Sequence, residues 1–234
     1  MKPVAIFRHS PGEGPGYFAT SLDSRSLPWQ LVRLDAGEPV PADPTAFSGL
    51  AFMGGPMSVN DSLPWIEPVC ALIRAAMAAD IPVIGHCLGG QLMSKALGGV
   101  VSKNPVKEIG WGEVCVADTP AAKAWLPDGQ GFLSFHWHGE TFSLPPGAEL
   151  LLASRHCAHQ AFAIGKHLGM QCHVEMTADL IRLWNSQWAD EVKGTPGPGV
   201  QTPEQMVEDL EPRLAALNGA AEKLYTKWIE GLKG

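Results

Sequence analysis

The ten-residue segment from Pro82 to Gln91, Pro-Val-Ile-Gly-His-Cys-Leu-Gly-Gly-Gln, constrains the fold of this chain more than any other feature. Its first residues form a short apolar run typical of a buried strand, and residues 88–97 have the pattern of a helix that stops at Gly98. Cys87 lies between them, with a glycine two residues before it and another two residues after it. A sharp turn from strand to helix needs small residues at those places, because a Cβ would crowd it. The segment therefore predicts an α/β fold with Cys87 at the carboxyl end of a central strand.

Segments with strand and helix patterns alternate along the chain, which is typical of a sheet with helices on its faces. We expect strands at residues 4–7, 31–34, 49–53, 81–84, 114–116, 131–135, 150–153, 160–164 and 168–173. Helices are expected at residues 66–79, 88–97, 178–192, 204–217, with a kink at Pro212, and 220–232. Together they predict a three-layer α/β fold in which a mostly parallel sheet carries helices on both faces. The later, shorter strands should complete the main sheet and add a small side sheet.

The length of 234 residues fits one α/β domain with a short accessory region. We assign residues 1–193 to the main domain. Residues 194–203 are rich in proline and glycine, which predicts a linker. Residues 204–234 should form a helical extension packed on the domain. Thr202 and Gln205 have the spacing of a capping box at the start of this extension.

Charge and hydropathy exclude several classes of protein. The net charge is −7, so the chain offers no basic surface for a nucleic-acid backbone. No apolar stretch approaches the length needed to span a membrane, and the apolar run at residues 4–7 is too short for a signal peptide. The five cysteines are scattered and odd in number, which argues against a disulfide framework or a zinc ribbon. We therefore expect a cytoplasmic protein that binds neither nucleic acid nor membrane.

Three segments carry residue types suited to nucleophilic catalysis. The expected helix N-terminus behind Cys87 would stabilise a thiolate. His173 and Glu175 would share one face of an extended strand, so the glutamate can orient the imidazole, giving a Cys-His-Glu triad. Gly54-Gly55 directly follows a predicted strand, and a backbone N–H there could join that of Leu88 in an oxyanion hole. Taken singly, each segment has a plainer interpretation: an inert buried cysteine, a strand-end histidine and a simple turn.

In order and spacing, the three segments resemble the class I glutamine amidotransferase family, including the glutaminase domain of GMP synthase. The Gly-x-Cys-x-Gly-x-Gln elbow, the Gly-Gly-Pro turn and the Gln-x-His-x-Glu segment all match, although Cys172 and Val174 replace the family's usual Phe and Pro. The likeness extends over roughly residues 1–190 and implies a flavodoxin-like fold. It also implies the following site: nucleophile Cys87, acid/base His173, its orienting Glu175, oxyanion donors Gly55 and Leu88, and substrate-binding residues Gly54, Gln91, Trp137 and His138.

Other motifs favour plain structural roles. His136 and His138, and the pair His156 and His159, could bind a metal by residue type. The second pair lacks a partner pair with the spacing of a zinc site, and the first lies in the substrate loop that the resemblance implies. We expect no metal and no organic cofactor. The glycine-rich segment 12–16 lacks the dinucleotide-binding spacing, so we expect a simple loop. The tryptophans, among them Trp184 and Trp188, are expected to be packing anchors.

The resemblance implies a hydrolase that cleaves the γ-amide of glutamine to glutamate and ammonia through a cysteine thioester. Such a chain could supply ammonia to a separate synthetase partner. Two alternatives stay open. One is a hydrolase of γ-glutamyl amides or peptides that acts without a partner. The other is a non-catalytic binding or redox-sensing protein that uses the elbow cysteine as an oxidation sensor.

Overall fold

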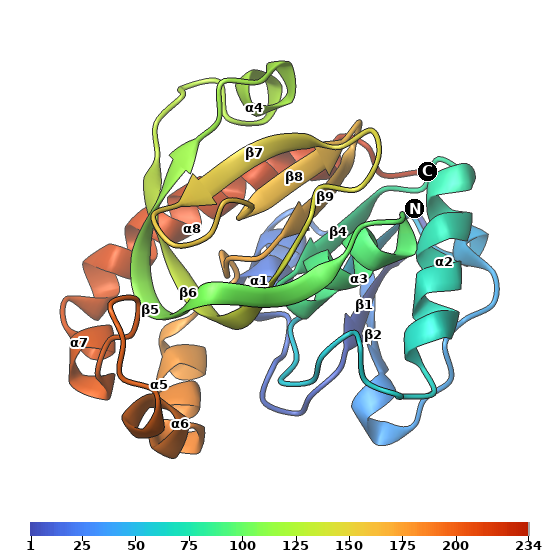
Figure 1. Cartoon of the computed structure of the whole chain (residues 1–234). Helices are drawn as coiled ribbons and strands as arrows, with labels where there is room; N and C mark the ends of the chain where they lie inside the picture. Colours follow the sequence, from blue (N-terminus) through green and yellow to red (C-terminus); the bar gives the residue numbers. More distant parts are fainter. Residues whose placement is uncertain (234) are drawn as a thin grey trace.

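A single mixed sheet forms the centre of the computed structural model, which describes residues 1–233 (Figure 1). Within these residues nine strands pair in the order β2-β1-β3-β4-β9-β8-β7-β5-β6. The pairings among β2, β1, β3, β4 and β9 are parallel, and those from β9 through β8, β7 and β5 to β6 are antiparallel. The strands are β1 Val4–Arg8, β2 Trp29–Arg33, β3 Gly49–Phe52, β4 Val83–His86, β5 Val101–Val116, β6 Phe132–Phe142, β7 Glu149–Ser154, β8 Ala161–Ile164 and β9 His167–Met170.

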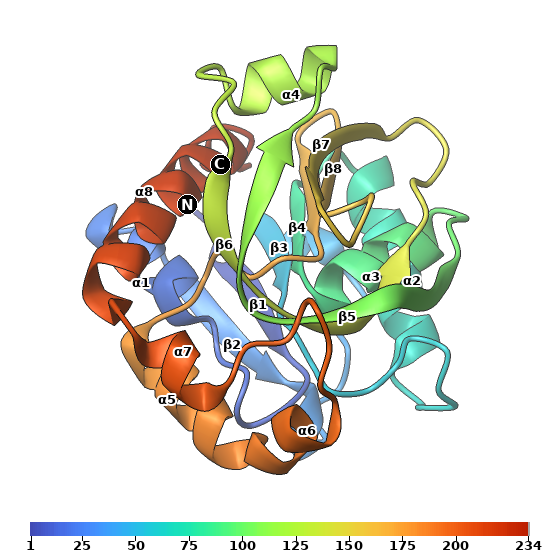
Figure 2. The same cartoon turned by 60° about the vertical axis from the view of Figure 1, so that its left-hand side comes forward.

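Helices cover both faces of this sheet. The helix pair α2 and α3 lies on one face, and α1 and α8 lie on the other, as Figure 2 shows on its right and left sides. The helices are α1 Gly16–Ser24, α2 Ile66–Ala78, α3 Leu88–Ala96, α4 Pro120–Trp125, α5 Ala178–Gln187, α6 Ala189–Gly194, α7 Pro203–Val207 and α8 Leu210–Ile229, with short 3-10 turns at Leu34–Ala36 and Pro44–Ala46. The three-layer α/β fold predicted from the sequence is confirmed.

The two faces of the sheet bury separate hydrophobic cores. In β1, Val4 and Ile6 belong to the core under α1 and α8, whereas Ala5 and Phe7 belong to the core under α2 and α3. Successive side chains of a strand point to opposite faces, so a strand buried on both faces must be apolar throughout. This is why residues 4–7 form an uninterrupted apolar run rather than an alternating one.

The antiparallel strands differ from the expectation of a small side sheet, because they continue the main sheet beyond β9. β5 and β6 are also much longer than predicted and form a curved hairpin along one side of the molecule (Figure 1). Their register shifts between Lys103 and Glu108, and Pro105 lies inside this irregularity. A proline there loses no ladder hydrogen bond, since a bulge leaves residues unpaired. The charged and proline-containing sequence of β5 therefore concealed a strand.

The segment after residue 193 is closely tied to the sheet. The backbone of Ile109 in β5 accepts a hydrogen bond from Gln201 N at 2.9 Å and donates one to Gly199 O at 2.8 Å. Thr202 forms the predicted capping box with Gln205. Beyond α7 the chain does not kink at Pro212, because a single helix, α8, runs from Leu210 and places this proline in its first turn, where a missing N–H costs little. The proposed division into domain, linker and extension stays a prediction.

No helix within residues 1–233 is long and apolar enough to cross a membrane.

Acid is expected to destabilise the fold through its buried histidines. Burial is the main cause that lowers the pKa values of His9, His136 and His167, each to about 4. A folded-state pKa below the unfolded value of about 6.5 means that unfolding takes up protons, so stability falls as the pH drops from about 6.5 toward 4. Each fully buried histidine should contribute a loss on the order of 3 kcal/mol over that range.

Urea unfolding at several pH values measures this loss. The unfolding free energy should decline below about pH 6.5, although the raised pKa values of His173 and Glu13 oppose part of this loss. His167→Gln should reduce the slope, because protonation of His167 Nδ1 removes the acceptor for the Val83 N–H at 3.2 Å. Equal stability at about pH 7 and pH 5 would contradict this assignment.

Candidate active site

Cys87 lies in a strained turn between β4 and α3. Its φ of 50° and ψ of −107° are unusual for a residue with a side chain, and such strain persists only where the surrounding structure enforces it. A Cβ on Gly85 would lie 2.4 Å from the Gly89 backbone, and a Cβ on Gly89 would lie 2.1 Å from Phe52 O. Both glycines are therefore required for α3 to pack closely on the strands, which fixes the direction of the Cys87 side chain.

His173 and Glu175 form a buried pair just beyond the end of β9. The Nδ1 atom of His173 lies 2.6 Å from Oε1 of Glu175, and both side chains are almost inaccessible to solvent. A backbone hydrogen bond of 2.8 Å from His173 N to Phe135 O anchors the segment on β6. Burial alone would lower the pKa of His173, but the charges of Glu175 and of the Cys87 thiolate raise it well above its ordinary value. Burial opposes ionisation of Glu175, yet the charge of His173 lowers the pKa of that carboxyl. These directions favour an imidazolium beside the carboxylate of Glu175.

The three predicted triad residues come together in one place. Cys87 and His173 line the same cavity, which has a volume of about 360 Å³. Glu175 lies behind the histidine, on the side of Nδ1. The arrangement can hold a thiolate and an imidazolium side by side, with a carboxylate that fixes the orientation of the ring.

The residues predicted to supply oxyanion donors are neighbours. A Cβ on Gly55 would lie 2.6 Å from Leu88 Cδ2, and Gly55 lines the cavity. Leu88 is the first residue of α3, so its N–H has no acceptor within the helix. The preceding glycine, Gly54, is different: a Cβ there would lie 2.0 Å from Glu13 Oε2 and 3.2 Å from His173 Cε1. Gly54 therefore makes room for two other side chains.

A chain of amides leads from the cavity wall to the nucleophile. Gln91, which lines the cavity, donates from Nε2 to Gln171 Oε1 at 3.0 Å. Gln171 in turn directs its own Nε2 at Cys87 Sγ, 3.5 Å away. On the opposite side, Sγ lies 3.9 Å from Trp137 O. Gln171 was part of the recognised motif but had no predicted role, and the structure places it against the cysteine.

An aromatic wall closes another side of the cavity, formed by Trp137, Trp184 and Trp188. Trp184 packs edge-on against the His173 ring, with centroids 4.9 Å apart. Glu191 of α6 accepts a hydrogen bond from Trp137 Nε1 at 3.0 Å and forms an ion pair with Lys107. Trp184 and Trp188 are therefore cavity residues as well as packing anchors, a role that their helical spacing alone did not reveal.

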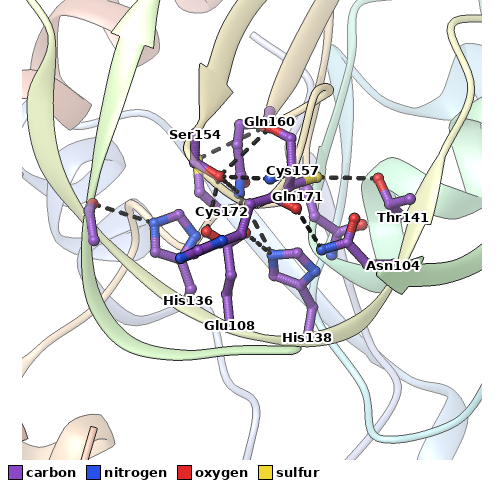
Figure 3. A network of polar contacts seen from close by, with 12 residues as sticks. Asn104, Glu108, His136, His138, Thr141, Ser154, Cys157, Gln160, Gln171 and Cys172 are labelled. Atoms are coloured by element: carbon purple, nitrogen blue, oxygen red, sulfur yellow. Dashed lines mark hydrogen bonds and ion pairs between the residues drawn. The ribbon is translucent and has the colours of Figure 1, made fainter. Parts of the chain in front are cut away.

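A buried polar network centred on Glu108 connects β5 with β6, next to Trp137 (Figure 3). His138 Nε2 lies 3.0 Å from Glu108 Oε2, and its Nδ1 lies 2.9 Å from Glu140 O. Ser154 and Gln160 donate to the two Glu108 oxygens, each at 2.8 Å. Burial opposes ionisation of Glu108, but the hydrogen bond with His138, the charges of His136 and His138 and the hydrogen bond from Ser154 lower the pKa of its carboxyl. The network fixes the segment from Trp137 to Glu140 that lines the cavity.

By residue type, the same region could hold a metal ion. Glu108, His136 and His138 each offer one ligand atom, and these atoms lie within 4.8 Å of one another. Both oxygens of Glu108 and both ring nitrogens of His138 already have protein partners, however. His136 Nε2 lies 3.2 Å from Gly112 O, while its Nδ1 has no partner among residues 1–233. Protein groups alone therefore satisfy most of the cluster.

The loop at residues 12–16 contributes to the site, which sequence analysis did not foresee. Glu13 is 5% exposed and lines the cavity together with Cys87 and His173. One signal was available in the sequence: the loop directly follows β1, and in open α/β sheets the carboxyl ends of parallel strands are where sites form.

Fold and site together define an α/β protein with a strained elbow cysteine and a buried histidine–glutamate pair, both at the carboxyl ends of central parallel strands of its sheet. The family model "Glutamine amidotransferase class-I" matches residues 18–181. The chain therefore belongs to the class I glutamine amidotransferase family, which confirms the resemblance noted from its motifs.

Individual relatives agree with this assignment. The chain is 30% identical over 180 residues to the glutamine amidotransferase-like protein YfeJ of Salmonella typhimurium, covering 74% of this chain and 75% of that protein. The crystal structure of a glutamine amidotransferase from Methylobacillus flagellatus superposes with a TM-score of 0.97 at 46% identity, covering 100% of this chain and 96% of the other. The GMP synthase of Lactobacillus delbrueckii is 35% identical over 133 residues, which cover 55% of this chain but only 24% of that enzyme.

Proposed function

We propose that this protein hydrolyses the γ-amide of glutamine to glutamate and ammonia through a thioester on Cys87. The observation that carries the proposal is that Cys87 and His173 line one cavity, with Glu175 behind the histidine raising the pKa of its ring. Membership of the amidotransferase family supports the same chemistry.

In the first half of the reaction the Cys87 thiolate attacks the carbonyl carbon of the side-chain amide. The N–H groups of Gly55 and Leu88 stabilise the oxyanion of the tetrahedral intermediate. His173 donates its proton to the leaving nitrogen, the carbon–nitrogen bond breaks, and ammonia departs. A γ-glutamyl thioester and a neutral imidazole remain.

Water completes the cycle. Neutral His173 accepts a proton from a water molecule as its oxygen attacks the thioester carbon, and the thiolate leaves as glutamate is released. The imidazolium and the thiolate are thereby restored together. Glu175 keeps Nδ1 protonated throughout, so Nε2 is the nitrogen that exchanges protons.

The amino-acid end of the substrate would bind in the remainder of the cavity. Gln91, His138 and Trp137 line it, and the backbone oxygen of Trp137 lies 3.9 Å from Cys87 Sγ. Gly54 was predicted to bind substrate directly, and we now assign it a supporting role, because its missing side chain accommodates Glu13.

A second candidate function is hydrolysis of γ-glutamyl amides or peptides without a partner. It is favoured by the extension of the cavity to Trp188 and Glu191, which leaves space for a leaving amine larger than ammonia. The two candidates share every chemical step and differ in the leaving group. Under the first candidate function, the released ammonia could serve a separate synthetase protein. The GMP synthase relatives are named as glutamine-hydrolyzing, which implies that one enzyme combines the two activities there.

The test measures glutamate and ammonia release from glutamine and from a panel of γ-glutamyl dipeptides. Hydrolysis of glutamine alone would support an ammonia-supplying amidotransferase, and hydrolysis of the dipeptides would favour the second candidate. Release of glutamate from none of these substrates, with no covalent adduct on Cys87, would refute both and leave a redox-sensing or binding role.

A further inference from the structure

Glu13 is the buried acidic group of the cavity that the proposed mechanism does not use. Its carboxyl and the His173 ring approach the same point, since a Cβ on Gly54 would lie 2.0 Å from Glu13 Oε2 and 3.2 Å from His173 Cε1. Glu13 Oε2 therefore lies close to Cε1, the ring atom between the two nitrogens of His173. Glu175 occupies a different position, on Nδ1.

The loop that carries Glu13 is held on both sides. Gly12 O accepts a hydrogen bond of 2.9 Å from Trp184 Nε1, and Glu13 N donates to Ser10 O at 3.0 Å. After the glutamate, Tyr17 N donates to Glu175 O at 2.8 Å. Gly16, with φ +49°, leaves no space for a Cβ, which would lie 2.2 Å from the same carbonyl. Glu13 is thus fixed relative to both the histidine segment and the aromatic wall.

We propose that Glu13 is a positioning residue for His173, whose ionised carboxylate stabilises the protonated ring from its Cε1 edge. The proposal rests on the acid/base role of His173 in the proposed function. His173 would thus have two carboxylate neighbours. Glu175 sets the orientation of the ring, and Glu13 adjusts how strongly the ring holds its proton.

The ionisation of Glu13 sets the pH range of this effect. Burial raises the pKa of Glu13 to about 7; the charge of His173 acts against the shift and that of Glu175 adds to it. Below about pH 7 the group is therefore neutral and contributes little to the imidazolium. Above that pH it becomes a carboxylate and raises the pH at which His173 loses its proton. The other titratable groups that line the cavity are Cys87, Lys107, His138, Glu140 and Glu191.

Glu13→Gln imitates the neutral form at every pH, which makes a direct test. The rate of Cys87 alkylation by iodoacetamide reports the state of the thiolate–imidazolium pair and needs no substrate. Peptide mass spectrometry separates Cys87 from exposed Cys115, which serves as a reference in the same sample. The pH–rate profiles of wild type and Glu13→Gln should coincide below about pH 6 and diverge above about pH 7, with the alkaline step of the variant about one unit lower.

Glu140→Gln is the matched control, because it removes another cavity glutamate whose charge does not act on Glu13. It should retain the wild-type inflection. Profiles for Glu13→Gln that coincide with wild type at all pH values, or that are displaced equally at all of them, would overturn the proposal. The NMR titration of the His173 Cε1–H in the wild-type protein, assigned by its loss in His173→Asn, should show an inflection near pH 7 and needs no Glu13 variant.

Turnover is measured separately. Divergent alkylation profiles without hydrolysis of any γ-glutamyl substrate would support the role of Glu13 and refute the proposed function. Glutamine hydrolysis together with identical alkylation profiles for wild type and Glu13→Gln would support the proposed function and refute the role of Glu13.

Discussion

Cys87→Ala is expected to lower glutamine hydrolysis by roughly 10⁴-fold or more, to the level of the background assay. Without the thiol neither the tetrahedral adduct nor the thioester can form, so the oxyanion donors and His173 have no covalent intermediate to act on. The substitution removes one sulfur from a site that is 6% exposed and keeps the backbone compatible with the turn. We therefore expect a folded, inactive protein.

The control for this variant is Cys115→Ala, which removes an exposed thiol on β5 outside the cavity. It should retain the wild-type rate. Thermal unfolding of both variants shows whether lost activity follows from lost structure. A folded Cys87→Ala protein that still releases glutamate at more than about one per cent of the wild-type rate would rule out Cys87 as the nucleophile.

Glu175→Gln is expected to lower kcat by about 10³- to 10⁴-fold with little change in KM. The amide can still fill the space, but it no longer supplies the negative charge that holds a proton on His173 Nδ1 and stabilises the imidazolium. Because Glu175 lies behind His173, away from the cavity lining, substrate binding should be nearly unaffected.

Steady-state kinetics over a range of pH tests this expectation. Glu175→Gln should also move the alkaline limb of kcat/KM to lower pH, because the carboxylate that raises the pKa of His173 is gone. Glu175→Asp keeps the charge and should recover part of kcat. Loss confined to KM, or an Asp variant no better than the Gln variant, would contradict an electrostatic role for this carboxylate.

Local motifs predicted the centre of the site because their geometry is set by near neighbours. The glycines two residues before and after Cys87 mark a sharp turn from strand to helix, and the backbone of Cys87 adopts the strained conformation that this turn requires. His173 and Glu175 are two residues apart, so one short segment carries both side chains, although β9 ends at Met170 and the backbone bends at Glu175 instead of continuing the strand to residue 173 as predicted. The alternating pattern of buried strands and amphipathic helices predicted the layers in the same way.

The contributions that sequence analysis missed depend on contacts between distant segments. Glu13 and Gln171 reach Cys87 and His173 only after β1, β4 and β9 have paired, and no local pattern records which loops then share an edge of the sheet. Trp184 has the spacing of an ordinary core residue, and only the placement of α5 turns it toward the histidine. The full length of β5 was hidden for a related reason, because its pairing with β6 overrides a sequence of low strand propensity around Pro105.

The central claim is that Cys87 carries the γ-glutamyl group during turnover. The most direct measurement is mass spectrometry of the protein quenched in acid within milliseconds of mixing with glutamine, followed by digestion. The account predicts a mass increase of one γ-glutamyl group on the peptide that contains Cys87, removed by hydroxylamine and absent from Cys87→Ala. Steady release of glutamate with an unmodified Cys87 peptide at every quench time would contradict it.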